Sequence, residues 1–297
     1  MQIGTVLIKP NIMNAACSVA KTIQDVQALA KTSIGAITVG SITVEKRETN
    51  PGQRWYVHES YALNSFGMPN EGASFYQKHL PTMIATAHSA GKKLSLSIAG
   101  FSTQEYVTLA KLAHAAKVDL LELNLGCPNA TADGRQKPIA SFNPVMIREI
   151  SEAVGAVTNI PLLLKLSPYS NPAELRAIAK TITELDKISA VVTSNTFANS
   201  MMFEGDTPVI TAQLGGLSGR ALLPISLGQV WQFRKLLPAH IAIIGVGGIE
   251  TAQDVNLYLQ AGASGVQVAT LIVRDGHHAI EGLRLYSTPT RSSSLLQ

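Results

Sequence analysis

Short apolar runs alternate with longer amphipathic segments along almost the whole chain, and this alternation restricts the fold more than any other feature of the sequence. Eight of the apolar runs have the length and composition of buried β-strands. They cover residues 12–16, 34–39, 93–99, 118–125, 160–167, 190–195, 241–248 and 265–270. Eight strands separated by helical segments predict an α/β fold of the closed (β/α)8 TIM-barrel type, rather than an open doubly wound sheet.

The segments between the strands carry helix-start and loop signals. Asn143-Pro144 and Asn171-Pro172 each place an asparagine cap before a proline at the first helical position. Ser102 or Thr103 is expected to cap another helix. Residues 43–73 and 199–219 are expected to be long loops at the carboxyl face, and the Ser/Thr-rich tail 287–297 is expected to fray. No linker divides the chain, so residues 1–297 are expected to form one domain.

Charge and composition exclude several classes of protein. The net charge of +4 is spread thinly, and its densest basic spots are only Lys46-Arg47 and Lys92-Lys93. Such a pattern disfavours binding to nucleic acid or to a lipid surface. The amino-terminal residues lack signal-peptide architecture, and no apolar stretch is long enough to span a bilayer. A soluble, cytoplasmic protein with reduced thiols is therefore expected.

The cysteine and histidine content argues against a metal centre. The chain has two cysteines, Cys17 and Cys127, which are too few for an iron–sulfur cluster or a cysteine-rich zinc site. Its seven histidines include one adjacent pair, His277-His278, and no His-Glu-x-x-His pattern. No metal is expected in the functional site.

The fourth apolar run ends on a group of reactive and polar side chains. Residues 118–129 read Val-Asp-Leu-Leu-Glu-Leu-Asn-Leu-Gly-Cys-Pro-Asn, so a strand stops at a turn that contains Cys127 and is flanked by Asn124 and Asn129. Barrel enzymes carry their chemistry at the carboxyl ends of their strands. A catalytic thiol is one interpretation of Cys127, and a buried structural cysteine is the other.

Two further strand ends have the small residues that a phosphate site needs. Gly245-Val-Gly-Gly-Ile249 follows the seventh strand and Ala269-Thr270 follows the eighth, where barrels commonly hold phosphate. Backbone amides approach a phosphate only where side chains are small. Either turn alone is also compatible with tight strand-to-helix packing, but both together favour a phosphate-bearing ligand.

A lysine lies inside the fifth apolar run, Leu162-Leu-Leu-Lys-Leu166. A buried ammonium is costly unless it meets an anion or hydrogen-bond acceptors. Lys165 therefore contacts a ligand carbonyl or anion, acts as a Schiff-base nucleophile, or snorkels to solvent at a strand edge. Carboxamides recur at the predicted strand ends and loops, and they suit a ring with alternating N–H and C=O groups. They are Asn64, Asn124, Asn129 and Asn195.

Several long motifs, in the right order, resemble those of the dihydroorotate dehydrogenases, and most closely the soluble, fumarate-linked class 1A group. The similarity runs from Met13 to about Gly276. The motifs are Glu45-Lys-Arg-Glu-Thr-Asn-Pro51, Leu63-Asn-Ser-Phe-Gly-Met-Pro-Asn70, Glu122-Leu-Asn-Leu-Gly-Cys-Pro-Asn129, Lys165-Leu-Ser-Pro-Tyr169, Gly215-Gly-Leu-Ser-Gly219 and Ile244-Gly-Val-Gly-Gly-Ile-Glu-Thr-Ala-Gln-Asp254.

The resemblance implies an FMN-binding barrel that oxidises dihydroorotate to orotate in pyrimidine biosynthesis. By this likeness Cys127 is the base that takes the C5 proton, and Lys165 lies near N1 and O2 of the flavin. The positions that match flavin contacts are Ala15, Ala16, Ser41, Asn124, Lys165, Ser194, Gly219, Gly247, Gly248, Ala269 and Thr270. The positions that match substrate contacts are Asn64, Phe66, Gly67, Met68, Asn124, Asn129, Asn195 and Thr196.

The sequence departs from the family pattern at three places. Gly40 stands where the soluble group has a lysine that reaches flavin and substrate, and losing that contact would cost about 1.5–3 kcal/mol. Cys17 replaces a common glycine and would press toward the flavin. Phe66 and Met68 also differ from the commonest residues of the substrate loop. A related FMN oxidoreductase acting on another cyclic amide or enone is therefore the alternative to dihydroorotate oxidation.

The remaining expectations concern the electron acceptor, the assembly and two other classes of function. Fumarate is the expected acceptor, because the membrane-associating extension of quinone-linked relatives is absent. Similar soluble relatives are homodimers, so a homodimer is expected by resemblance. A lyase or aldolase that uses Lys165 as a Schiff base, and a catalytically weak flavin-binding protein, are competing hypotheses.

Overall fold

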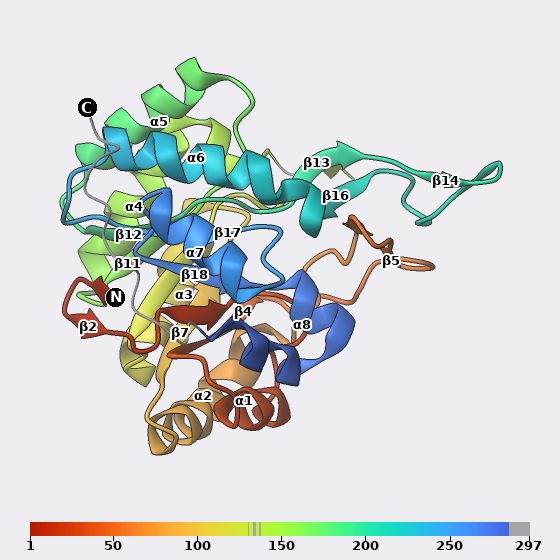
Figure 1. Cartoon of the computed structure of the whole chain (residues 1–297). Coiled ribbons are helices and arrows are strands. Elements are labelled where there is room, and N and C mark those ends of the chain that lie inside the picture. Colours follow the sequence, from red (N-terminus) through yellow and green to blue (C-terminus); the bar gives the residue numbers. More distant parts are fainter. Residues whose placement is uncertain (130, 133–134, 137, 285–297) are drawn as a thin grey trace.

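A closed barrel of eight parallel strands forms the centre of the computed structural model, which describes residues 1–129, 131–132, 135–136 and 138–284 (Figure 1). Its strands follow the chain order around the barrel, which confirms the predicted TIM barrel. They are β3 (Ile12–Asn14), β4 (Ala36–Ile42), β7 (Lys93–Ile98), β8 (Leu120–Asn124), β11 (Leu162–Lys165), β12 (Ile188–Val192), β17 (Ala242–Val246) and β18 (Gly265–Val268). The predicted fraying of 287–297 lies outside the described residues.

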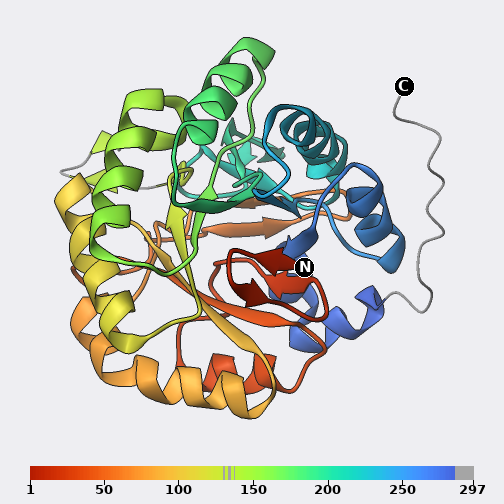
Figure 2. The same ribbon diagram turned by 90° about the vertical axis from the view of Figure 1, so that its left-hand side faces the viewer.

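Helices surround the barrel, and their first turns are capped largely as expected (Figure 2). Asn143 accepts hydrogen bonds from the Val145 and Met146 amides, Asn171 accepts from the Ala173 amide, and Ser102 rather than Thr103 caps its helix. The helices are α1 (Ile23–Ala30), α2 (Gly72–Ser89), α3 (Thr103–Ala116), α4 (Pro144–Val157), α5 (Pro172–Thr183), α6 (Leu223–Leu236), α7 (Ala252–Gln260) and α8 (Thr270–Asp275), with 3₁₀ segments η1 (Ala140–Phe142), η2 (Arg220–Leu222) and η3 (His277–Leu283).

Apolar side chains form one core between barrel and helices and a second core inside the barrel. The inner core is closed at one end by the hairpin of β1 (Gln2–Ile3) and β2 (Val6–Leu7), which lies across the barrel (Figure 2). Ile3 and Ile8 are fully buried there. This hairpin was not predicted from the sequence, because its strands have only two residues each. With one end closed, ligands enter the barrel from the other end.

The two segments that were expected to be loops contain short strands, so this prediction was wrong in part. β5 (Trp55–Val57) and β6 (Ala62–Asn64) pair with β16 (Gly215–Ser218) and β13 (Phe197–Ser200) in a four-stranded antiparallel sheet. The pairing of β6 with β16 joins residues about 150 positions apart, as in Asn64↔Gly216, and local sequence does not report it. β14 (Phe203–Glu204) and β15 (Thr207–Pro208) form a hairpin that projects from the barrel (Figure 1).

The small sheet lies at the carboxyl ends of the barrel strands and brings two loops together there. It joins the loop after β4 to the loop after β12, and another short hairpin, β9 (Thr131–Ala132) with β10 (Arg135–Gln136), follows β8. None of the helices in the described ranges is long and apolar enough to cross a membrane.

Candidate active site

A cavity at the carboxyl ends of the barrel strands holds the candidate residues. It contains about 1170 Å³ of empty space, including its open mouth, which is ample for a ligand of cofactor size. Every residue that the sequence analysis singled out for catalysis, flavin binding or substrate binding contributes to its wall. These residues are Ala15, Ala16, Ser41, Asn64, Phe66, Gly67, Met68, Asn124, Cys127, Asn129, Lys165, Ser194, Asn195, Thr196, Gly219, Gly247, Gly248, Ala269 and Thr270.

The four asparagines converge as two hydrogen-bonded pairs. Asn129 Nδ2 donates to the backbone oxygen of Asn64 at 3.0 Å and to its Oδ1 at 3.2 Å. Asn195 Nδ2 donates to Asn124 Oδ1 at 3.2 Å, and Asn124 Nδ2 donates to Ser41 Oγ at 2.8 Å. These contacts fix the orientation of amides that face the cavity. The site therefore offers donors and acceptors in set positions, which suits a polar ring.

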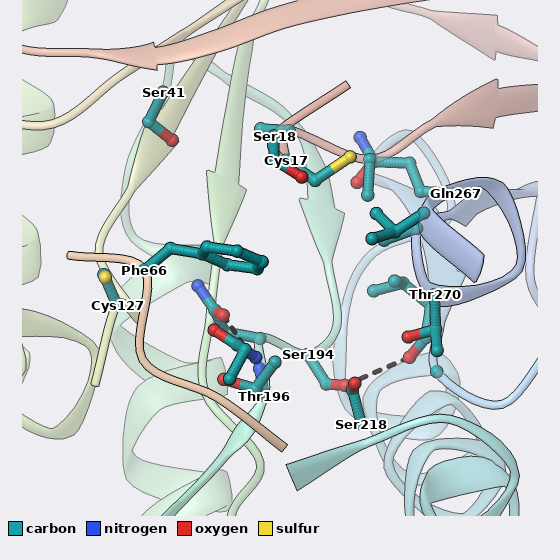
Figure 3. Close-up of a pocket in the computed structure, with 18 of the residues that line it drawn as sticks. Cys17, Ser18, Ser41, Phe66, Cys127, Ser194, Thr196, Ser218, Gln267 and Thr270 are labelled. Carbon is teal, nitrogen blue, oxygen red and sulfur yellow. Dashed lines mark hydrogen bonds between the residues drawn. The ribbon is translucent and has the colours of Figure 1, made fainter. Parts of the chain in front are cut away.

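The two thiols lie on different sides of the cavity. Cys127 follows β8 and lies beside Phe66, whereas Cys17 follows β3 and lies near Gln267 (Figure 3). Neither thiol forms a disulfide within the described chain. Burial raises the pKa of Cys17, although the Val19 backbone amide partly offsets this. Cys17 therefore remains a neutral thiol at pH 7, and it lines the cavity.

Lys165 is held inside the barrel by a polar relay. Its side chain is only 4% exposed, and Nζ donates a 3.0 Å hydrogen bond to Gln267 Oε1. Gln267 Nε2 donates at 2.8 Å to Oε2 of Glu122, and both Gln267 and Glu122 are fully buried. The structure excludes the interpretation of Lys165 as a lysine that snorkels to solvent. Its ammonium is instead one of the buried polar groups that line the cavity.

The turn after β17 needs glycine for two reasons. Gly247 and Gly248 have φ values of 125° and 70°, which favour glycine. A Cβ on Gly248 would lie 2.7 Å from the backbone nitrogen of Leu223, so no side chain fits. Arg220 supports this turn, because its Nη1 donates to the Gly248 carbonyl at 3.4 Å and pairs with Asp254 Oδ1 at 2.6 Å. Tight packing therefore explains these glycines, and their backbone still lines the cavity.

Other lining residues were not found from the sequence. Ser218 is buried, and its Oγ has no hydrogen-bond partner in the structure. Trp55 stacks on Phe66 with ring centroids 5.8 Å apart. Lys21 and Gln267 also line the wall. Gln267 did carry a signal, because it is a polar residue within an apolar strand, as Lys165 is.

The backbone at Gly40 has no room for the lysine that the resemblance led us to expect. Gly40 has a φ of 120°, and a Cβ would lie 2.4 Å from the carbonyl oxygen of Ser97. Within the described residues that line the cavity, Lys21 and Lys165 are the only lysine or arginine side chains. No group of three potential metal-ligating His, Cys, Asp or Glu residues occurs in the described part of the chain.

Comparison with known proteins places this chain in a family. The sequence model described as "Dihydroorotate dehydrogenase" matches residues 3–284. Dihydroorotate dehydrogenase (fumarate) of Trypanosoma cruzi is 32% identical over 272 residues, which are 89% of this chain and 84% of the relative. The catalytic subunit of dihydroorotate dehydrogenase B (NAD(+)) of Alkaliphilus metalliredigens is 33% identical over 261 residues, 85% of this chain and 82% of the relative.

A solved structure shares the fold. The crystal structure of DHODH from Eimeria tenella in complex with ferulenol superimposes with a TM-score of 0.77 at 21% identity, and the match covers 92% of this chain and 79% of that one. At this identity the likeness supports the barrel fold alone.

Proposed function

Since the chain belongs to the dihydroorotate dehydrogenase family and is an oxidoreductase acting on a CH–CH group, we propose that it oxidises dihydroorotate to orotate with FMN. The observation that carries this proposal is the single cavity that holds a thiol, Cys127, together with a buried ammonium, Lys165, and two amide pairs. We further propose that residues 1–297 act as one FMN-binding barrel domain.

The lining of the cavity fits FMN. The buried hydroxyl of Ser218 has no partner in the structure and suits a polar ligand atom. The turn at Gly247 and Gly248 brings backbone close to the cavity where the phosphate is proposed, and Ala269 and Thr270 follow the neighbouring strand β18. The Lys165 ammonium suits the negative charge that a flavin acquires on reduction. FMN supplies a hydride acceptor when bound.

The protein groups have distinct proposed roles around that acceptor. Cys127 takes the proton from C5 of dihydroorotate as hydride leaves C6. Asn64, Asn124, Asn129 and Asn195 bind the ring amides, and their mutual hydrogen bonds orient them before substrate arrives. Trp55 stacked on Phe66 shields the mouth of the cavity from water. The remaining proposed substrate contacts are Gly67, Met68 and Thr196, and the remaining proposed flavin contacts are Ala15, Ala16, Ser41, Ser194 and Gly219.

The decisive experiment uses the purified protein loaded with FMN. Under anaerobic conditions, dihydroorotate is expected to bleach the flavin absorbance, and orotate is expected to appear in equal amount. A yellow protein that dihydroorotate does not bleach would sink the substrate assignment. Screening other cyclic amides and enones by the same absorbance would then test the alternative, which Gly40 favours because no cation reaches the site from β4.

Fumarate is the proposed electron acceptor. The T. cruzi relative is fumarate-linked by name, but a relative of similar identity is the catalytic subunit of an NAD(+)-linked enzyme. Adding fumarate to the bleached protein is therefore expected to restore the flavin absorbance faster than NAD⁺ does. The opposite order would assign the chain to the NAD⁺-linked group. The homodimer and the cytoplasmic location stay predictions, and light scattering on the purified protein tests the first.

A further inference from the structure

One cation in the cavity has no role in the proposed function so far. Lys21 lies in the loop between β3 and α1 and lines the cavity, and its Nζ donates a hydrogen bond to the backbone oxygen of Pro69. Pro69 belongs to the segment 64–69, most of which lines the same wall. Lys21 therefore connects the first βα loop to the proposed substrate loop.

The start of α1 holds the backbone of Lys21 in place. Asp25 Oδ2 accepts hydrogen bonds from the Lys21 amide at 2.9 Å and from the Thr22 amide at 2.8 Å, while Thr22 caps the helix. This capping box fixes the chain immediately before the first turn of the helix. The lysine is consequently carried on a rigid element, and its side chain reaches the cavity from a defined point.

Lys21 has no ion-pair partner among the described residues, so its ammonium can pair with an anionic group of a ligand. The titratable groups that act on its ammonium are the thiols of Cys17 and Cys127 and the carboxylate of Asp25. Asp25 already accepts the two backbone hydrogen bonds, and no ion pair between Lys21 and a carboxylate occurs among the described residues. Glu250, the one carboxylate on the cavity wall in the described ranges, pairs with Arg274 at 3.1 Å.

The other cation of the cavity, Lys165, is hydrogen-bonded inside the barrel. Lys165 is buried within the barrel and donates to Gln267, whereas Lys21 is partly exposed and contacts the loop next to Cys127. Position 40 supplies no charge because it is a glycine with no room for a side chain. Lys21 is thus the cation available at the mouth of the site.

We propose that Lys21 binds the carboxylate of the substrate and so determines the specificity of the site for an anionic pyrimidine. This inference rests on the proposed function, since dihydroorotate carries a carboxylate on C6, the carbon that loses hydride. A charge-assisted hydrogen bond from an ammonium to that carboxylate orients the ring with C5 toward Cys127. The cation that β4 does not supply comes instead from the loop after β3.

Burial gives this contact a characteristic pH dependence. Desolvation lowers the pKa of Lys21 to about 8, and its electrostatic interactions with Cys17, Asp25 and Cys127 only partly oppose this. The free enzyme therefore loses the ammonium as the pH rises through about 8. A bound carboxylate favours the charged form, so binding of an anion above that pH takes up a proton.

The test measures the dissociation constant of orotate from the FMN-loaded protein between pH 6.5 and 9, by the change in flavin absorbance. Wild type is expected to bind orotate about tenfold more weakly for each pH unit above the pKa. Lys21→Met is expected to bind about ten- to a hundredfold more weakly at pH 7, with no such dependence on pH. Lys21→Arg is expected to bind at pH 9 as tightly as at pH 7. Lys78→Met removes the same charge from the exposed face of α2 and is expected to match wild type.

The outcomes separate this inference from the proposed function. Wild-type protein that binds FMN but not orotate would overturn the proposed function. The role of Lys21 alone would be overturned if wild type binds orotate and the dissociation constant of Lys21→Met is within threefold of the wild-type value. It would also be overturned if the two proteins show the same dependence of orotate binding on pH. Should Lys21→Met fail to retain FMN, the wild-type and Lys21→Arg profiles still decide, because a wild-type affinity that does not change above pH 8 contradicts the proposal.

Discussion

Lys165 Nζ lies 3.0 Å from Gln267 Oε1, and this amide joins a buried cation to a buried anion. The amide can face only one way, because its oxygen must accept from the ammonium while its NH₂ group donates to Glu122 at 2.8 Å. Lys165 and Gln267 are 102 residues apart, and the contact exists only because the barrel closes. The relay holds the ammonium at the cavity and keeps the two charges from being buried without partners.

Gln267→Met is expected to lower the free energy of unfolding by about 2–4 kcal/mol, because it leaves Lys165 and Glu122 without their shared partner at nearly constant volume. Urea unfolding followed by circular dichroism measures the effect. Gln232→Met on the outer helix α6 serves as the matched control, since Gln232 only donates to the Gly228 carbonyl of its own helix at 3.3 Å. A loss below about 0.5 kcal/mol at position 267 would contradict the relay.

Lys165→Met is expected to slow reduction of the flavin by dihydroorotate about 10²- to 10³-fold, the range seen when one preorganised donor to a developing negative charge is removed. Anaerobic stopped-flow absorbance measures the rate, and the FMN content of the variant shows whether binding survives. A reduction rate equal to that of wild type would remove Lys165 from the proposed role. Trapping of substrate on Lys165 by borohydride in colourless protein would favour the Schiff-base alternative.

The barrel could be predicted from the sequence because its signals are local. Each strand is a short apolar run. Two helix starts are indicated by an asparagine before a proline, at Asn143 and Asn171. The antiparallel sheet was not predicted because its strands are three to four residues long, and because its central pair, β6 with β16, joins residues about 150 positions apart. Such pairs have too little local periodicity to be recognised.

The site residues that could be predicted from the sequence are charged or polar side chains within apolar strands. Lys165 is a charged residue in an apolar strand, which marks it as a candidate site residue. Glu122 and Gln267 are polar residues in apolar strands and carry the same signal. Lys21 gave no such signal, because a lysine before a helix cap is an ordinary surface residue in sequence. Its approach to Pro69 depends on how two separate loops meet over the barrel.

Cys127→Ala is expected to reduce the rate of flavin reduction by dihydroorotate about 10²- to 10⁴-fold, because the base for the C5 proton is removed while the ring contacts remain. Cys17→Ala is the matched variant, since it removes a thiol from the same cavity on the other side (Figure 3). Its effect on the rate is expected to be at least tenfold smaller. Unchanged turnover in Cys127→Ala would assign the proton transfer to another group.

Arg220→Met is expected to weaken FMN binding, because Arg220 ties the turn at Gly248 to Asp254 through its contacts at 3.4 Å and 2.6 Å. Burial raises the pKa of Asp254, but Arg220 and the backbone amides of Glu250 and Thr251 more than offset this and hold it below its usual value. The stabilisation from Asp254 is therefore complete above about pH 4, the pKa of an unfolded aspartate, and is lost as the pH falls further. Fluorescence titration of FMN at pH 7 measures the affinity, and an affinity equal to that of wild type would refute the role of Arg220.

Lys21→Met is expected to make the protein more stable at pH 7, because the wild type keeps a partly desolvated ammonium whose pKa is lowered to about 8. The folded wild type binds fewer protons than the unfolded chain between pH 8 and about 10.5, so its stability rises with pH over that range by at most about 1.4 kcal/mol per unit. The advantage of the variant is therefore largest below pH 8 and shrinks as the pH increases. Urea unfolding of both proteins at pH 7, 8 and 9 measures the difference. A variant less stable than wild type at pH 7, or a difference that does not change with pH, would show that Lys21 serves the fold rather than a ligand.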